Sequence, residues 1–87
     1  MLDELFKAVG VKDLTNISEP IINMVGNHLV IVTNSMGIMD LSDSLVCVKA
    51  DKTKKIIIEG EFLECMMLNK SEVQVKGRIL DVRWEKL

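Results

Sequence analysis

The chain contains few side chains that could do chemistry: one histidine, His28, and two cysteines, Cys47 and Cys65. Catalysis needs a nucleophile with a base, a tuned acid and base, or a metal ion. Neither cysteine lies in a CxxC pair, and no HExxH, GxSxG or phosphate-loop signature occurs. Each cysteine lies among apolar residues, where a free thiol packs as a small hydrophobe. We expect His28 to be a partly buried core residue, and we predict no catalytic residues, no cofactor, no metal site and no enzymatic activity.

Two acidic residues, Glu59 and Glu61, flank a glycine and could in principle share acid–base work. Both point to the face of the strand opposite to that of their apolar neighbours, as expected for charged residues on a solvated face. Lys76 and Arg78 flank another glycine in the same way. If the two segments are adjacent strands, we expect these opposite charges to pair across the ladder.

Two groups of residues could instead bind a partner. The first is the lysines of the run KADKTKK at residues 49–55, namely Lys52, Lys54 and Lys55. They suit a solvated hairpin loop, with contact to anionic lipid or phosphate as the alternative. The second group shares one strand parity near the end of the chain and consists of Leu80, Val82 and Trp84. Trp84 is either a packing residue or an anchor in a subunit interface, where tryptophan is enriched.

The composition bounds the class of protein. A chain of 87 residues has room for one domain, yet 48% of it is hydrophobic and most of that is aliphatic. A small domain with surplus aliphatic residues often buries them in an oligomer interface, so we expect a homo-oligomer. The net charge of −2, from 11 basic and 13 acidic residues, argues against a nucleic-acid partner.

The N-terminal segment differs from the rest. Residues 1–10 predict a short amphipathic helix, because the apolar residues of LDELFKAV recur at helical spacing. Residues 11–20 read as a connector ending at Pro20. The segment lacks the basic residues and long apolar core of a signal peptide, and no run approaches the roughly 20 apolar residues that span a bilayer. We therefore expect a cytoplasmic protein, with a peripheral membrane contact as the remaining option.

Residues 21–87 predict one β domain built from a repeat of 17 residues. The four copies are residues 21–32, 38–49, 55–66 and 72–83. The central position of each copy is a candidate bend: Gly26, Asp43, Gly60 and Gly77. Beyond it the apolar residues change parity, and in the first copy the new parity selects Leu29 and Ile31 for the buried face. The change indicates a bulge or a bend in mid-strand, where glycine is favoured.

These repeats predict a mainly β fold. We expect four or more bent antiparallel strands in a meander, with hairpin loops at residues 33–37, 50–54 and 67–71. The strands would form a curled sheet or a small barrel-like sandwich, with the short N-terminal helix against one end. The alternative is a β-solenoid with one rung of about 17 residues per repeat.

Part of the chain resembles a known family. Pro20-Ile21, Gly26-Asn27, Leu29, Ile31, Asn34 and Gly37-Ile38, followed by Ile56, Ile58, Gly60 and Leu63 and then Glu72-Val73, Val75, Gly77 and Ile79, look like the YabP/YqfC family of sporulation proteins. The similarity runs from about residue 17 to residue 84. It implies a small protein of endospore-forming bacteria that is needed for spore formation, and it supplies no catalytic residues and no molecular activity.

Three functions remain open at the level of the sequence. The first is a non-enzymatic sporulation protein, a self-associating structural or adaptor module that acts alone or with another sporulation protein. It would work in the cytoplasm of the sporulating cell, or peripheral to a membrane or to the developing spore surface. The second is an Sm-like nucleic-acid-binding module, on grounds of architecture only. The third is a lipid-binding or small-molecule-binding β domain with the lysines at its mouth.

Overall fold

The computed structural model describes residues 19–87, and every regular element in this range is a β-strand. The strands are β1 (Ile21–Val25), β2 (Leu29–Thr33), β3 (Ile38–Leu41), β4 (Leu45–Lys49), β5 (Lys54–Asn69) and β6 (Glu72–Lys86). The helix expected at residues 1–10 and the connector up to residue 18 lie outside the described residues. The mainly β fold predicted from the sequence is confirmed.

The strands form one antiparallel sheet with the order β1-β2-β6-β5-β4-β3. From β3 to β6 each strand pairs with the next one, as a meander requires. The first hairpin departs from that scheme, because β2 pairs with β6 at the other end of the chain. A simple meander is therefore wrong, and the parallel rungs of a β-solenoid are excluded by the antiparallel pairing.

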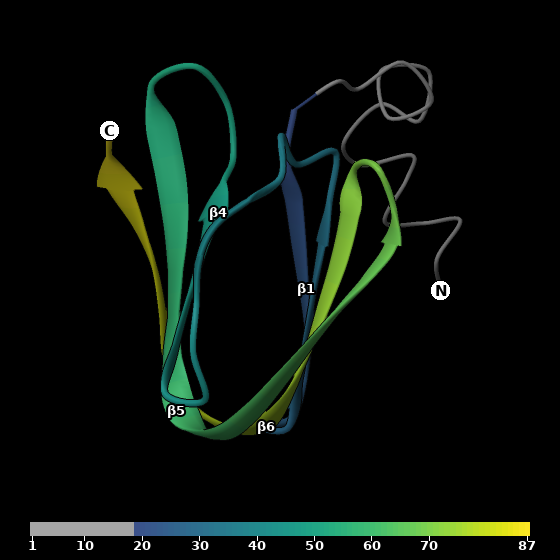
Figure 1. The fold of residues 1–87 in the computed structure, drawn as a ribbon, viewed down its shortest axis with the longest axis vertical. Helices are drawn as coiled ribbons and strands as arrows, with labels where there is room; N and C mark the ends of the chain where they lie inside the picture. The colour runs from purple at the N-terminus through teal and green to yellow at the C-terminus, as the bar shows by residue number, and fades with distance from the viewer. Residues whose placement is uncertain (1–18) are drawn as a thin grey trace, which may run out of the picture.

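The long strands β5 and β6 bend in the middle and fold the sheet into two arms that face each other (Figure 1). The first arm contains β1, β2, residues 72–77 of β6 and residues 64–69 of β5. The second arm contains β3, β4, residues 54–60 of β5 and residues 79–86 of β6. The sheet does not close, so the molecule is an open sandwich and not a barrel.

The four sequence repeats adopt two different shapes. Copies three and four are the continuous bent strands β5 and β6, as expected. Copies one and two fold back as hairpins, which corrects the prediction of four bent strands. Gly26, at φ +53°, begins the first turn. In the second turn the Ser42 hydroxyl accepts the N–H of Leu45 at 3.0 Å, and the Ser42 N–H donates to the Leu45 carbonyl at 2.9 Å.

Each hairpin turn is bonded to a bend of one long strand. The N–H groups of Gly77 and Ile79 donate to the carbonyls of His28 and Asn27 at 3.2 and 2.7 Å. On the second arm the N–H groups of Gly60 and Leu63 donate to the carbonyls of Ser44 and Asp43 at 3.1 and 2.8 Å. The expected bend positions therefore gather at the closed end of the sandwich, two in turns and two in bends.

The core lies between the two arms. Its buried members come from four strands and the β4–β5 turn: Val30, Val32, Val46, Val48, Ala50, Ile56, Ile58, Leu63, Val73, Val75 and Ile79. Full burial of each valine or isoleucine stabilises the fold by about 1.5–3 kcal/mol. The change of parity is visible in β5, where Ile56 and Ile58 are buried before the bend and Leu63 after it.

Two expectations about the core are wrong. The parity assigned to the first repeat selected Leu29 and Ile31, but β2 buries Val30 and Val32 because its turn shifts the register by one residue. His28 was expected to be partly buried, and it is exposed because it lies in the turn between β1 and β2. A parity inherited from a continuous strand does not survive a turn.

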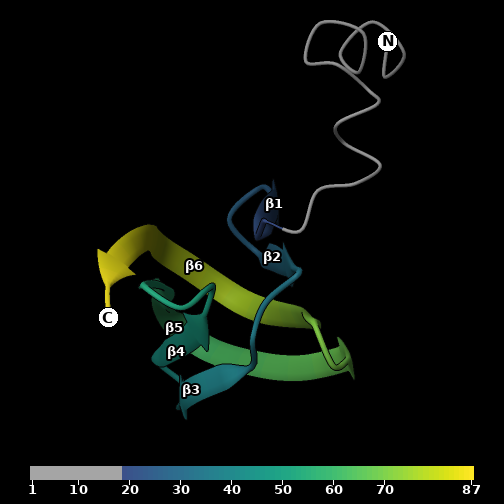
Figure 2. The ribbon, with the colours of Figure 1, turned by 90° about the horizontal axis from the view of Figure 1, so that it is seen from above.

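Residues 34–37 cross from the first arm to the second at the open end (Figure 2). The N–H and the hydroxyl of Ser35 both donate to the carbonyl of Ser71, at 2.8 and 3.1 Å. The N–H of Met36 donates to the carbonyl of Lys49 at 2.7 Å. The crossing therefore ties the β5–β6 turn of one arm to the end of β4 in the other.

Candidate interaction surface

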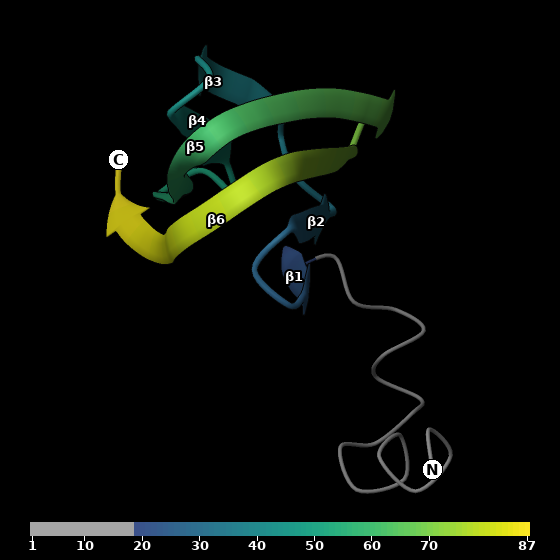
Figure 3. The ribbon, with the colours of Figure 1, turned by 90° about the horizontal axis from the view of Figure 1, so that it is seen from below.

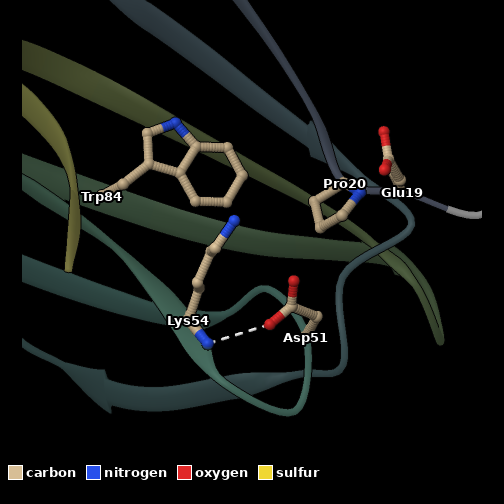
Figure 4. Close-up of a pocket in the computed structure, with 5 residues that line it drawn as sticks. All are labelled: Glu19, Pro20, Asp51, Lys54 and Trp84. Carbon is tan, nitrogen blue, oxygen red and sulfur yellow. Dashed lines mark hydrogen bonds between the residues drawn. The ribbon is translucent and has the colours of Figure 1, made fainter. Parts of the chain in front are cut away.

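A hollow of about 420 Å³ opens between the tips of the arms, and the described residues that line it are Glu19, Pro20, Asp51, Lys54 and Trp84 (Figure 4). Trp84 pairs in register with Ile56, a core residue, so both point to the inner face of the second arm. Glu19 and Pro20 directly precede β1 of the first arm. Trp84 is 47% exposed, so the hollow leaves much of this residue uncovered.

The polar groups of the hollow are held mainly by a turn. The carboxylate of Asp51 accepts hydrogen bonds from the N–H groups of Thr53 and Lys54, at 2.8 and 2.9 Å, and from the Thr53 hydroxyl at 3.1 Å. The bond from the Thr53 N–H is the largest cause that lowers the pKa of Asp51. In Figure 4 the ammonium of Lys54 extends toward the space between Trp84 and Pro20. The described lining of the hollow thus offers one aromatic ring, one cation and two carboxylates.

The structure separates the three lysines that the sequence grouped together. Lys54 faces the hollow. Lys55 lies on the opposite face of β5, in register with Glu85 of β6. Lys52 lies exposed in the turn before β5. A single basic patch at the mouth of a pocket is therefore not formed.

The three apolar residues of β6 have different environments. Val82 packs against the core, whereas Leu80 is 63% exposed and Trp84 is 47% exposed. All three lie in the half of β6 whose only partner strand among residues 19–87 is β5. This surface is therefore a free sheet edge with apolar side chains beside it.

The described part of the chain has four such free edges. They are β1, β3, residues 64–69 of β5 and residues 79–86 of β6. The views from above and below place β1 and the end of β6 on one flank, and β3 and the end of β5 on the other (Figures 2 and 3). Each flank thus presents unpaired backbone groups from both arms.

Phe62 was missed as a surface residue because its repeat position matches that of Ile79. Phe62 is 81% exposed at the bend of β5, whereas Ile79 is buried in the core. Its φ of +54° is a left-handed conformation that bulky residues rarely adopt. Nothing in the sequence distinguishes the two positions, because both follow a glycine and a charged residue.

The charges of the second arm pair on its outer face. Arg83 contacts three carboxylates, those of Glu59 and Asp81 at 2.7 Å and that of Glu85 at 2.8 Å. Hydrogen bonds to these carboxylates, that of Glu85 first, raise the pKa of Arg83.

Of the two cross-strand pairs expected from the sequence, one is present. Arg78 contacts Glu61 at 3.4 Å. Lys76 does not reach Glu59, because the antiparallel register sets it opposite Glu64. The acidic residues Glu59, Glu61, Asp81 and Glu85 therefore form structural ion pairs with the two arginines.

Both cysteines are free. Cys47 is buried, with its sulfur 4.0 Å from that of Met39, and Cys65 is half-buried on β5. Burial raises the pKa of both thiols. A raised pKa disfavours the thiolate, which is the reactive form, so these cysteines suit packing better than chemistry.

Comparison of the chain with known protein families, with curated proteins and with solved structures finds no match. Among residues 19–87, no group of three or more His, Cys, Asp or Glu side chains could hold a metal ion. No helix in that range is long and apolar enough to cross a membrane.

Proposed function

We propose that this chain is a non-enzymatic sporulation protein that acts as a self-associating structural or adaptor module in spore formation, in the cytoplasm of the sporulating cell or on the developing spore surface. The sporulation role rests on the resemblance of residues 17–84 to the YabP/YqfC family. Self-association rests on one observation, the four free sheet edges. Unpaired strands bind another strand readily.

The apolar side chains beside those edges add to this argument. Met24 of β1, Leu41 of β3, Met67 of β5 and Trp84 of β6 are between 47% and 59% exposed. One such residue lies on each of the four edges. Burial against a second molecule would remove this apolar surface from water, which favours association.

Two measurements test the proposal. Size-exclusion chromatography with light scattering should show an oligomer whose fraction grows with concentration, and a strict monomer at high micromolar concentration would contradict self-association. Deletion of the gene in its endospore-forming host should lower the yield of heat-resistant spores. An unchanged yield would contradict the sporulation role.

A lipid-binding or small-molecule-binding domain is the second candidate, and the hollow favours it. The register sets Lys54 directly opposite Lys86, and like charges in that position repel each other. An anionic headgroup near Trp84 would relieve this repulsion. The Sm-like nucleic-acid alternative gains no such support, because the outer face of the second arm carries carboxylates around Arg83.

Liposome co-sedimentation separates this candidate from the first. If anionic vesicles bind at the hollow, Lys54→Glu should abolish co-sedimentation. Lys55→Glu is the matched control, since Lys55 lies on the opposite face of the same strand. Equal loss in both variants would indicate nonspecific attraction to the surface and would contradict a site in the hollow.

A further inference from the structure

The four free edges differ in charge. β3 carries Asp40, and residues 64–69 of β5 carry Glu64. Residues 79–86 of β6 carry two acidic residues, Asp81 and Glu85, and two basic residues, Arg83 and Lys86. β1, with the sequence IINMV, carries no charge at all. Charged residues on an edge strand discourage pairing with another chain. β1 is therefore the edge that lacks this protection.

β1 is also complementary to itself. In an antiparallel alignment centred on Asn23, Ile21 opposes Val25 of a second copy and Ile22 opposes Met24. Asn23 opposes Asn23 on the two-fold axis. Apolar side chains then meet apolar side chains on both faces, and the one polar side chain meets a hydrogen-bonding partner.

The exposure of these residues fits such a pairing. Ile21 is 37% exposed, and Met24 and Val25 are each 49% exposed. Ile22 and Met24 pair in register with the buried residues Val32 and Val30 of β2, so they lie on the inner face. A second β1 would extend the first arm of both molecules into one sheet and would cover apolar surface on both faces.

Other alignments are poorer. A shift of the β1 pairing to centre on Ile22 or Met24 opposes Asn23 to Ile21 or Val25 and shortens the overlap. A two-fold alignment of β3 opposes Asp40 either to another Asp40 or to Ile38, and both arrangements are unfavourable. The overlap is also bounded, because Pro20 lacks an N–H before β1 and the turn at Gly26 follows it.

We propose that β1 pairs with β1 of a second copy of this chain, antiparallel and about a two-fold axis at Asn23. The proposal rests on the self-association put forward above and names its interface. An interface of this kind uses the same strand in both molecules and closes as a dimer. The flank with β3 remains available to another partner.

Site-specific cross-linking tests the register. Residues that oppose each other in an antiparallel pair have Cα atoms about 4.5–5.5 Å apart, within the range that a disulfide spans. With Cys65→Ser as background, Asn23→Cys should give a covalent dimer on oxidation. Val25→Cys is the matched control, because the two copies of residue 25 would lie four residues apart, about 13 Å.

A mixed experiment sharpens this test. Ile21→Cys and Val25→Cys should each give no covalent dimer on oxidation when alone, and they should form a covalent heterodimer when mixed. Cross-linking of Val25→Cys alone, or none for Asn23→Cys and for the mixture, would overturn the proposed register.

A charge at the axis tests the interface without cross-linking. Asn23→Asp would oppose two carboxylates and should weaken dimerisation by at least about tenfold. Leu41→Asp on the other edge strand should leave it unchanged, and circular dichroism should show that both variants fold. If the protein associates but Asn23→Cys gives no covalent dimer and Asn23→Asp does not weaken dimerisation, the β1 interface is wrong while self-association stands. A monomer at all concentrations contradicts both.

Discussion

Gly60 of β5 lies against the carbonyl oxygen of Arg78 in β6, so close that a Cβ atom on residue 60 would overlap this oxygen. Gly77 has the reciprocal place, since its Cβ would lie 2.7 Å from the carbonyl oxygen of Phe62. The two long strands thus pass each other at the bend with no room for a side chain on either glycine. This contact allows one pair of strands to serve both arms.

Gly60→Ala should therefore destabilise the protein strongly, by about 3 kcal/mol or more, because a rigid backbone must move to admit the methyl group. Urea denaturation followed by circular dichroism would measure the loss. Gly77→Ala should be at least as harmful, since it adds the strain of a positive φ, +142°, to the overlap.

Gly37→Ala is the control for backbone strain. Gly37 has a φ of +110° but nothing within 4 Å of its Cβ position. Its substitution should cost about 1–3 kcal/mol from the strained conformation alone. If Gly37→Ala proved more destabilising than Gly60→Ala, close passage of the strands would not explain the glycines at the bend.

Phe62 and Leu63 are neighbours with opposite environments, and substitutions at the two positions should change the free energy of unfolding in opposite directions. Phe62 is 81% exposed at a φ of +54°, so Phe62→Asn loses little burial and relieves strain, because asparagine tolerates this region. We expect a gain of up to about 1 kcal/mol in the free energy of unfolding. Leu63 is buried, and Leu63→Ala should cost about 2–5 kcal/mol.

Thermal unfolding of the two variants beside the parent protein tests this contrast. A loss of stability in Phe62→Asn comparable to that in Leu63→Ala would mean that Phe62 is covered in solution. In that case the bend of β5 at Phe62 would be part of an interface.

The sequence repeat predicts where the chain changes direction but not how. Gly26 and Gly60 hold the same repeat position, yet one begins a hairpin turn and the other lies in a continuous bent strand. The outcome depends on which segments pair over long range, and local sequence does not record it. The inward parity of β2 was misassigned for the same reason, since it depends on the number of residues in the turn.

The candidate surface shows a similar limit. The exposed position of Trp84 and its meeting with Lys54 follow from the register of β5 on β6, which joins residues about 30 apart in the sequence. The sequence identified both residues as candidates for an interaction surface. It did not predict that Lys54 and Lys55 lie on opposite faces, because that depends on where β5 begins. Strand alternation puts consecutive lysines on opposite faces once β5 begins at Lys54.

Arg83 holds three carboxylates together, so Arg83→Met should destabilise the protein by leaving Glu59, Asp81 and Glu85 to repel one another. Added salt should restore part of the stability through screening, and so should a lower pH, because protonation removes the repelling charges. Arg78→Met is the matched control. Its single exposed contact with Glu61 contributes little, and urea midpoints of the two variants at low and high salt should differ clearly.

Asp51 should make the stability depend on pH at the acid end. Hydrogen bonds, that from the Thr53 N–H first, hold the pKa of Asp51 below its ordinary value of 3.8. A carboxyl group with a lowered pKa in the folded state contributes stability that is complete above the unfolded value and is lost as the pH falls through the folded value. The contribution should therefore be intact at neutral pH and decline below about pH 4.

Asp51→Asn isolates this effect, because asparagine keeps an oxygen acceptor for Thr53 and Lys54 but does not titrate. Its stability relative to the parent protein should be lowest near neutral pH, and the difference should shrink as the pH falls below 3.8. Urea midpoints measured between pH 2 and pH 7 would give the curve. A constant difference across this range would show that the charge of Asp51 adds nothing to the turn that shapes the hollow beside Trp84.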